Sequence, residues 1–351
     1  VRRFTMMTRI SIDSPTPLPG VCAGRRLCEA THDHRRTNAA ALMPGTTKEI
    51  DAAVARLRAG ELVAFPTETV YGLGADARNP AALRKVYALK GRPATHPLIL
   101  HLHSADQLSS WAAQVSPTAQ RLAARFWPGP LTLVLRRAAG VADELTGGQD
   151  TIAVRVPAHP VARALLAAFG SGIAAPSANR YGRVSPTRAA HVREEFADDL
   201  LVLEGGDCEV GLESTIVSLV GETAQLLRPG AISRAALEAE LGMPLQLPVV
   251  GTAPRVPGSV AQHYAPQTPL TLVPAGALEA AVKRAEARGE LVVTLACAPG
   301  ADAVSYGRAL YAELRRLDKQ GASRILVESV PESADWDAVR DRLTRAAATF
   351  R

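Results

Sequence analysis

Cysteine and long apolar runs are both scarce in this sequence. The four cysteines are scattered along 351 residues, and no two of them form a C-x-x-C pair. This spacing excludes a disulfide framework and the common zinc sites, and it suits a reducing compartment, so we expect a cytoplasmic protein. No run of 18 apolar residues occurs, and we therefore expect no membrane span.

Three common catalytic signatures are also missing: the Walker phosphate loop, the H-E-x-x-H pair and the G-x-S-x-G elbow. One G-x-G-x-x-A pattern does occur, in "GLGADA" at 72–77. However, a hydroxyl-rich stretch separates it from the strand before it, and no acidic residue that ends a second strand follows about 20 residues later. We therefore do not expect a dinucleotide site there.

Positive charge is low on the part of the chain that we expect to fold. The whole sequence has 40 Lys and Arg against 34 Asp and Glu, a net charge of +6. Residues 1–45 contain seven arginines and three acidic residues, or +4, which leaves 6 − 4 = +2 for the rest. A protein that binds RNA over a broad surface concentrates more positive charge on its folded part, so a general RNA-binding role is not favoured.

Composition and periodicity divide the chain into four regions. Residues 1–45 have prolines, arginines and no regular period, and we expect a disordered N-terminal extension. Residues 46–242 alternate between strand and helix patterns, starting with a capping box from Thr46 to Glu49. Residues 243–267 are rich in proline and read as an extended linker, and residues 268–351 alternate again as a small domain.

The expected fold class is α/β. In the first domain we expect a mixed, twisted sheet with strands at 61–65, 97–102, 131–136, 151–156, 172–176, 200–205, 214–220 and 224–228. Its helices are expected at 46–60, 79–91 and 232–242, with two helical pieces between 105 and 126. The small domain is expected to be Rossmann-like, with strands at 270–274, 290–296 and 324–329 around helices at 277–288 and 306–319.

Polar residues gather where the apolar strands of the first domain end. "PTETVYG" follows the first strand and brings two hydroxyls, a carboxylate and a phenol together. Lys90 and Arg92 project into one loop after a helix, where they suit a phosphate clamp, although cations at a helix C-terminus are common for a purely structural reason. Arg155 stands in an apolar strand, where a charge needs a partner or a ligand.

Other candidates are less specific when taken singly. Ser177, Asn179 and Ser185 are ordinary turn formers, and His101 suits a hydrogen-bonded histidine of a sheet. Ser214 and Arg228 repeat the arrangement of a polar residue beside an apolar strand.

In order along the chain, seven blocks resemble the YrdC-like domain of threonylcarbamoyl-AMP synthases. They are "FPTETVYGLGADA", "KGRP…HPLILHL", "WPGPLTLVL", "DTIAVRVPAHP", "APSANRYGRVSPT", "GLESTIV" and "LLRPG". The linker's "HYAP" and the small domain resemble the long, two-domain form of the family. The resemblance covers nearly everything except the N-terminal extension.

This resemblance implies an L-threonylcarbamoyladenylate synthase, a nucleotidyltransferase. Such an enzyme converts L-threonine, bicarbonate and ATP to threonylcarbamoyl-AMP and pyrophosphate, for the threonylcarbamoyladenosine modification of tRNA. Mg²⁺ is expected with ATP, but the sequence shows no carboxylate cluster dedicated to it, so we expect no metal site on the protein itself and no tightly bound cofactor. A downstream tRNA threonylcarbamoyl transferase would consume the product, and we expect weak or no direct tRNA binding.

The resemblance also implies roles for individual residues. Lys90 and Arg92 would be catalytic and would bind the phosphates of ATP. The S-x-N pair would lie beside those phosphates, with Asn179 at ATP and Ser177 also close to threonine. Threonine would further be held by Thr69, His101, Ser214 and Arg155, the last taking its carboxylate. The remaining nucleotide contacts would come from His96, Thr151, Ser185, Arg228 and Tyr264. Thr67, Thr69 and Tyr71 are expected to form a polar wall, with Gly72 and Gly74 allowing close approach.

Two features depart from the family pattern. His96 stands where the family usually has asparagine, which puts that phosphate contact in doubt. The linker reads "VPGSVAQHYAP" and lacks two basic residues that usually precede "HYAP". Its length and proline content are compatible with an extended path across the first domain, where Tyr264 would cover the nucleotide or simply anchor the linker.

Two other functions are compatible with a YrdC-like domain. One is a non-catalytic RNA-binding module, which the nearly neutral body of the chain disfavours. The other is a carbamoyl transferase subunit of the hydrogenase-maturation type, which would require zinc-finger modules and hence C-x-x-C pairs.

Overall fold

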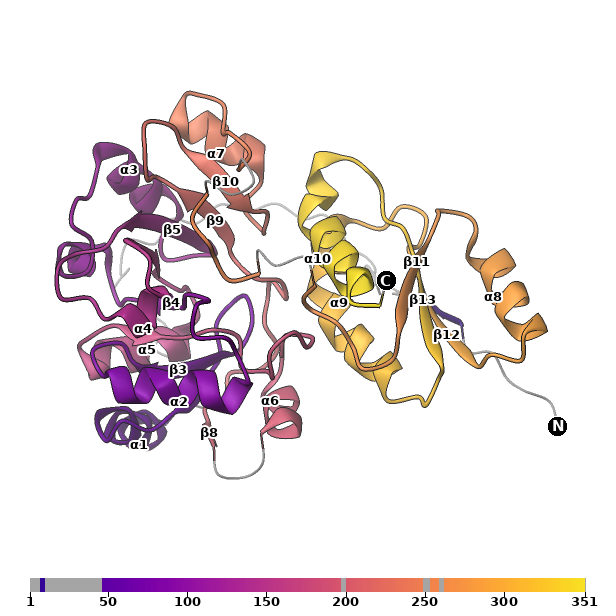
Figure 1. Cartoon of the computed structure of the whole chain (residues 1–351), viewed down its shortest axis with the longest axis horizontal. Helices are drawn as coiled ribbons and strands as arrows, with labels where there is room; N and C mark the ends of the chain where they lie inside the picture. The colour runs from indigo at the N-terminus through magenta and orange to yellow at the C-terminus, as the bar shows by residue number, and fades with distance from the viewer. Residues whose placement is uncertain (1–6, 10–45, 197–199, 249–252, 259–261, 351) are drawn as a thin grey trace, which may run out of the picture.

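Two α/β units lie side by side in the computed structural model, which describes residues 7–9, 46–196, 200–248, 253–258 and 262–350 (Figure 1). Its α-helices are α1 (Thr47–Arg58), α2 (Pro80–Lys90), α3 (Pro117–Phe126), α4 (Asp143–Thr146), α5 (Pro160–Phe169), α6 (Ala189–Glu195), α7 (Arg234–Leu241), α8 (Leu278–Ala287), α9 (Ala303–Asp318) and α10 (Asp337–Ala348). Two short 3₁₀ turns are η1 (Ala105–Ser110) and η2 (Ala334–Trp336). No helix within these ranges is both long and apolar enough to cross a membrane.

The first domain is built on a nine-stranded mixed sheet in the order β10-β9-β5-β6-β4-β7-β3-β2-β8. The strands are β2 (Val63–Phe65), β3 (Gly72–Asp76), β4 (Ile99–His101), β5 (Leu131–Arg136), β6 (Thr151–Arg155), β7 (Ile173–Ala174), β8 (Leu201–Val202), β9 (Thr215–Ser218) and β10 (Gln225–Arg228). The β4–β6, β5–β9 and β2–β8 pairs are parallel, and the others are antiparallel. The expected mixed sheet is therefore confirmed.

Side-chain alternation decides which residues of this sheet can form a site. β4 and β6 are in register, with Ile99 opposite Ala153 and His101 opposite Arg155. Because side chains alternate between faces, these four share one face, whereas their neighbours such as Leu100 enter the main apolar core on the other face. The site is therefore built on the face that carries His101 and Arg155.

Several elements were missed by the sequence patterns. No strand was expected at 72–76, where Gly72 and Gly74 were expected to allow close approach, but these residues form β3, paired with both β2 and β7. A Cβ at Gly74 would come within 2.9 Å of the Phe65 ring, so this glycine serves close packing within the sheet. Helices α5 and α10 and the short α4 and α6 were also not predicted.

The described residues of the linker pack against the first domain. The backbone N–H of Arg255 donates to Gln149 Oε1 at 2.7 Å, and Gln149 Nε2 donates to Arg255 O at 3.0 Å. Val256 joins a buried apolar cluster with Ile99 and Ala153, on the face of the sheet that carries the site. Ala265 donates to Gly182 O at 2.8 Å, so contacts with the first domain continue to the end of the linker.

The small domain has a four-stranded parallel sheet in the order β1-β12-β13-β11, as expected for a Rossmann-like unit. Its strands are β1 (Met7–Arg9), β11 (Leu270–Val273), β12 (Val292–Ala296) and β13 (Arg324–Glu328). Helices α9 and α10 face the first domain, whereas α8 lies on the far side (Figure 1). The expectation of disorder throughout residues 1–45 is wrong for β1, because the free edge of β12 offers backbone hydrogen bonds to it; the other residues of that segment lie outside the described ranges.

Candidate active site

A small cavity lies between the sheet of the first domain and the linker, with a volume of ≈ 40 Å³. Its wall is formed by Thr67, Thr69, Val70, Gly72, Arg92, Ile99, His101, Arg155, Ala175, Pro176, Ser177, Glu213, Ser214 and Arg228, and by the linker residues Pro257, Gly258, His263 and Tyr264. The structure thus brings eight of the predicted residues together: Thr69, Arg92, His101, Arg155, Ser177, Ser214, Arg228 and Tyr264.

Arg155 organises one end of the cavity. It donates to Thr69 Oγ1 at 2.8 Å, to Glu68 Oε1 at 2.5 Å and to Gly129 O at 3.1 Å. The Thr67 and Thr69 hydroxyls are 2.8 Å apart. Burial raises the pKa of Glu68, but the charge of Arg155 and its hydrogen bond outweigh burial, so the pKa lies below its usual value. Arg155 is therefore held rigidly with its charge balanced, next to two hydroxyl groups.

Arg228 and Ser214 form a second hydrogen-bonded group in the cavity wall. Arg228 donates to Ser214 O at 2.9 and 3.1 Å, and to the linker carbonyl of Pro257 at 2.8 Å. The Ser214 hydroxyl lies 2.7 Å from the Thr132 hydroxyl on β5. Among the described residues, Arg228 donates its hydrogen bonds to carbonyl and hydroxyl oxygens and to no carboxylate. Its positive charge is therefore not directly paired.

Lys90 and Arg92 lie beside each other, but only Arg92 lines the cavity. Lys90 Nζ donates to Ser177 O at 2.5 Å and to Asn179 O, and burial together with the charge of Arg92 lowers its pKa well below the usual value. Arg92 donates to Pro97 O at 2.9 Å. Lys90 thus holds the backbone of the S-x-N turn, while Arg92 is part of the cavity wall.

Two buried histidines add neutral polar groups. Burial, with the nearby charge of Arg155, lowers the pKa of His101 to about 3. Burial is also the largest cause for His263, whose pKa falls to about 3. Both imidazoles are therefore uncharged at neutral pH, and His101 Nδ1 lies 3.2 Å from Ile99 O, in agreement with the expectation of a hydrogen-bonded histidine of the sheet.

Five predicted residues do not line the cavity: Lys90, His96, Thr151, Asn179 and Ser185. Thr151 lies at the start of β6, paired with Arg136. His96 is partly exposed, with its Nδ1 3.0 Å from the Tyr181 hydroxyl.

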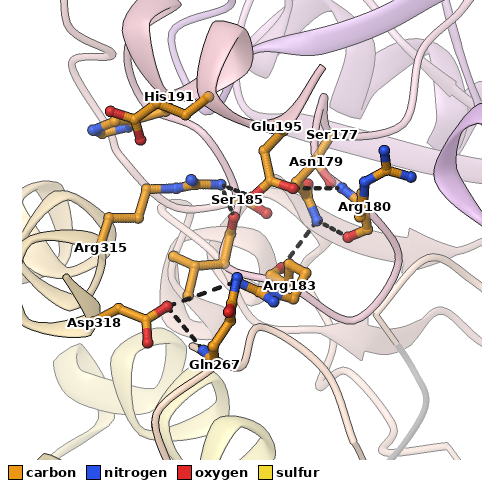
Figure 2. Close-up of polar contacts among 12 residues, drawn as sticks. Ser177, Asn179, Arg180, Arg183, Ser185, His191, Glu195, Gln267, Arg315 and Asp318 are labelled. Atoms are coloured by element: carbon orange, nitrogen blue, oxygen red, sulfur yellow. Dashed lines mark hydrogen bonds and ion pairs between the residues drawn. The ribbon is translucent and has the colours of Figure 1, made fainter. Parts of the chain in front are cut away.

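Asn179 and Ser185 are buried in the turn that follows Ser177, and neither lines the cavity itself. Asn179 donates to Arg180 O and Arg183 O, which holds the turn in shape (Figure 2). Ser185 donates to Glu213 at 2.5 Å.

The expectation that Tyr71 belongs to the polar wall is wrong. Its ring is fully buried in the main core of the first domain, and its hydroxyl donates to Gly206 O at 3.0 Å. Thr67 and Thr69 do line the cavity. The sequence could not distinguish these residues because the chain between β2 and β3 turns, so the strand alternation that would orient Tyr71 does not apply there.

Tyr264 is buried against the small domain with an unusual backbone. Its φ is +63°, in the left-handed region, and its ring stacks on Tyr311 at 6.0 Å between centroids. The Arg342 guanidinium lies 5.1 Å from the same ring. Among the described residues no group hydrogen-bonds the Tyr264 hydroxyl, the Asn179 Oδ1 or the His263 Nδ1.

Some residues of the site were not predicted from the sequence. Glu213 and His263 line the cavity, and Glu68 binds Arg155 behind it. Each stands next to a predicted residue: Glu68 in "TETV", Glu213 in "LEST" and His263 in "HYAP". Their position beside a predicted residue was the one sequence signal that could have identified them. Gly258 is required because a Cβ there would lie 2.0 Å from the Tyr264 hydroxyl, a contact that only the folded linker creates.

The carboxylates nearest the cavity are already bound to arginines. Within the described ranges, no group of three or more His, Cys, Asp or Glu side chains is arranged to hold a metal ion. The two carboxylates at the cavity are already in ion pairs, Glu68 with Arg155 and Glu213 with Arg342. Carboxylates bound in this way are poor candidates for a hard cation.

Taken together, the fold and the cavity define an α/β enzyme with a buried, arginine-lined site for a polar, anionic ligand. Residues 55–230 match the Sua5/YciO/YrdC sequence family, described as "Telomere recombination", and residues 232–348 match "Threonylcarbamoyl-AMP synthase, C-terminal domain".

Curated relatives and a solved structure point to the same family as these sequence matches. A threonylcarbamoyl-AMP synthase of Pyrococcus abyssi is 39% identical over 320 residues, covering 85% of this chain and 94% of that protein. One of Bacillus subtilis is 36% identical, with 85% and 93% covered. The crystal structure of P. abyssi Sua5 complexed with L-threonine superposes with a TM-score of 0.81 at 37% identity, covering 86% of this chain and 95% of that one.

This chain belongs to the threonylcarbamoyl-AMP synthase family, in its two-domain form. A shorter relative of the same name, from Thiobacillus denitrificans, is 39% identical over 174 residues, which are 50% of this chain and 92% of that protein. The resemblance read from the sequence is confirmed, and so is the enzyme function over a non-catalytic RNA-binding module.

Proposed function

We propose that this chain is a nucleotidyltransferase that makes threonylcarbamoyl-AMP and pyrophosphate from L-threonine, bicarbonate and ATP. The observation that carries the proposal is that one buried cavity combines a rigid Arg155–hydroxyl end with Arg92 and Arg228, for which the described residues supply carbonyl partners but no carboxylate. An amino acid suits the first end, and a triphosphate suits the second.

At the amino-acid end, the Arg155 fork would take the threonine carboxylate, because a guanidinium binds carboxylates in two parallel hydrogen bonds. The hydroxyls of Thr67 and Thr69 would receive the threonine side chain. His101, neutral at physiological pH, would leave the amine free to react with bicarbonate, because it adds no competing charge.

At the nucleotide end, Arg92 and Arg228 would neutralise the phosphates of Mg²⁺-bound ATP. Lys90 would act from behind, through the turn that carries Ser177 and Asn179. The carbamate oxygen would then attack the α-phosphate and release pyrophosphate, a transfer that needs positioning and charge neutralisation more than a covalent nucleophile.

Buried polar atoms without protein partners support a polar ligand. The Tyr264 hydroxyl and the His263 Nδ1 both belong to this group among the described residues, and both residues line the cavity. Such atoms are costly unless a ligand or water satisfies them. The product would be passed to a transferase that acts on tRNA.

The test is pyrophosphate release by the full chain, with threonine, bicarbonate and ATP omitted one at a time and the adenylate identified by mass. We expect release only when all three are present. Serine should be a weak substrate, whereas valine should fail, because its methyl group offers no hydrogen bond to the Thr67 and Thr69 hydroxyls. Equal release with valine would refute this assignment of the amino-acid end, and retention of tRNA in a gel without any turnover would favour the RNA-binding alternative.

A further inference from the structure

Glu213 places a carboxylate on the wall of a cavity whose proposed substrate is a polyanion. It lies 7% exposed beside Ser214, and it lines the cavity together with Arg92 and Arg228. An unpaired carboxylate there would repel a triphosphate and would also compete with it for Arg228. The site therefore depends on what neutralises Glu213.

The neutralising groups come from the small domain. Arg342, on α10, donates from Nε to Glu213 Oε2 at 2.8 Å, and Tyr311, on α9, donates its hydroxyl to the same oxygen at 2.9 Å. The only other side-chain donor among the described residues is Ser185, which binds Oε1 at 2.5 Å. Helices α9 and α10 are the two that face the first domain (Figure 1).

All three guanidinium nitrogens of Arg342 are already hydrogen-bonded within the protein. Its side chain is fully buried, and its remaining nitrogens donate to Pro229 O at 3.1 Å and to Asp341 at 2.6 Å. Burial alone would raise the pKa of Glu213, but the charges of Arg342 and Arg228 and the hydrogen bonds from Ser185 and Arg342 lower it to about 2. Glu213 is therefore ionised at neutral pH.

A second set of contacts joins the small domain to the turn after Ser177. Arg315, on α9, binds Glu195 at 2.9 Å and also donates to Val184 O, and Arg183 lies 3.7 Å from Asp318 (Figure 2). These contacts fix the position of α9 on the first domain. They bring no charge to the cavity, whereas the Arg342 contact does.

We propose that the small domain completes the active site electrostatically: Arg342 neutralises Glu213, and thereby leaves Arg228 free to bind the triphosphate of ATP. Arg342 is thus a positioning residue, because it acts on the substrate only through Glu213 and Arg228. The inference rests on the proposed function for the identity of the anion. It also gives the second domain a task in a family where the T. denitrificans relative is about half as long as this chain.

Loss of Arg342 should weaken the binding of ATP more than the binding of threonine. Without Arg342, Glu213 would turn to Arg228, which now donates to Ser214 O and Pro257 O. ATP would then lose a cation and meet an anion. Threonine should be less affected, because its proposed partner Arg155 is paired with Glu68 and not with Glu213.

The experiment is a double-mutant cycle in the full chain: wild type, Arg342→Met, Glu213→Gln and the double variant. The affinities for Mg²⁺-ATP and for L-threonine are measured separately by calorimetry, and KM and kcat by pyrophosphate release. We expect Arg342→Met to weaken ATP binding at least tenfold while threonine binding changes less than threefold. In the double variant, which removes both charges, ATP affinity should return to within about threefold of wild type.

A control and a rescue variant make the outcome decisive. Arg340→Met removes an arginine from the same helix that pairs with Asp337 on the surface, and it should leave both affinities unchanged. Arg342→Lys keeps the charge and should bind ATP more tightly than Arg342→Met. Equal losses of ATP and threonine affinity, or a double variant no better than Arg342→Met, would overturn the proposal in favour of a purely structural contact.

The proposal can still be tested if the Arg342→Met variant does not fold. Should Arg342→Met be insoluble, the double variant and Arg342→Lys decide: both must fold and bind ATP near wild-type affinity, and weak ATP binding by either overturns the proposal. Since calorimetry needs no turnover, a wild-type chain that binds ATP but releases no pyrophosphate would refute the proposed reaction and leave the charge inference standing on its own result.

Discussion

Backbone carbonyl groups bind most of the cations of this site. Lys90 donates to two carbonyls of the 177–179 turn, Arg92 to Pro97 O, and Arg228 to Ser214 O and Pro257 O. A carbonyl dipole orients a cation without cancelling its charge, as a carboxylate would. The side chains are therefore fixed in place while a positive potential remains for an anionic substrate.

Lys90 gives a direct test of this arrangement. Replacing Lys90 with methionine should lower adenylate synthesis by about 30- to 1,000-fold, the range for losing about 2–4 kcal/mol of transition-state stabilisation. It should also destabilise the fold, because the carbonyls of Ser177 and Asn179 lose their partner. Trypsin should then cut faster at Arg180 or Arg183, which limited proteolysis followed by mass spectrometry would detect.

The matched control is Lys85→Met. Lys85 lies on the same helix, its Nζ donates to Gly60 O at 2.7 Å, and neither residue lines the cavity. It should cost a little stability and no activity. Wild-type turnover in Lys90→Met would show that the turn does not need this cation.

Among the larger elements, the linker has the clearest local requirement. Gly258 has φ +78°, and an added Cβ would lie 2.0 Å from the Tyr264 hydroxyl and 3.2 Å from Arg228 Nη1. Tyr264 and Arg228 both line the cavity, so the linker backbone must pass close to them with no side chain between. A substitution at Gly258 should therefore open one wall of the site.

We expect Gly258→Ala to raise the KM for ATP at least tenfold and to release more pyrophosphate per adenylate captured, because water enters the displaced wall. Steady-state kinetics with product trapping measures both. Gly276→Ala is the control: its φ is +74°, but nothing lies within 4 Å of the added Cβ. If the two variants share the same small loss of stability and the same kinetics, backbone strain alone explains the effect and the contact with Tyr264 has no role.

For the molecule as a whole, buried histidines make stability depend on pH. Burial is the largest cause in each case, and it lowers the pKa of His101 to about 3, of His191 to about 4 and of His263 to about 3. In the unfolded chain a histidine titrates near 6.5, so below that pH the unfolded state binds protons that the folded state does not. The histidine contribution is complete above about pH 6.5 and decreases as the pH falls toward each folded pKa.

The free energy of unfolding should therefore fall between pH 7.5 and 5.5, by on the order of 1 kcal/mol per buried histidine. Urea unfolding followed by circular dichroism at several pH values would measure it. His191→Gln, at a position outside the cavity lining, should reduce the slope without abolishing it. An unchanged slope would mean that His191 takes up protons equally in the folded and unfolded states, so that burial does not lower its pKa.

Local patterns along the chain were sufficient to place many elements. The alternation in "LTLVLR" predicted β5 over 131–136, and the capping box at Thr46 predicted the start of α1, where both reciprocal hydrogen bonds form. Motif order likewise led to the family and to most residues of the cavity. These signals work because caps, turns and side-chain periods depend only on residues a few positions apart.

Contacts between segments far apart in the sequence determined the elements and side-chain positions that local patterns did not predict. Glycine-rich β3 forms because β2 and β7 supply its hydrogen bonds, although glycine itself disfavours strands. Tyr71 enters the core instead of the cavity for the same tertiary reason.

The clearest case is Glu213, whose partner Arg342 is 129 residues away in another domain. The sequence alone determined the family, the order of elements and the chemical types of side chain available for a site. Only the packing of the small domain and linker onto the first sheet decided which charges meet, because burial and Coulomb interactions depend on distance in space, which no local pattern encodes.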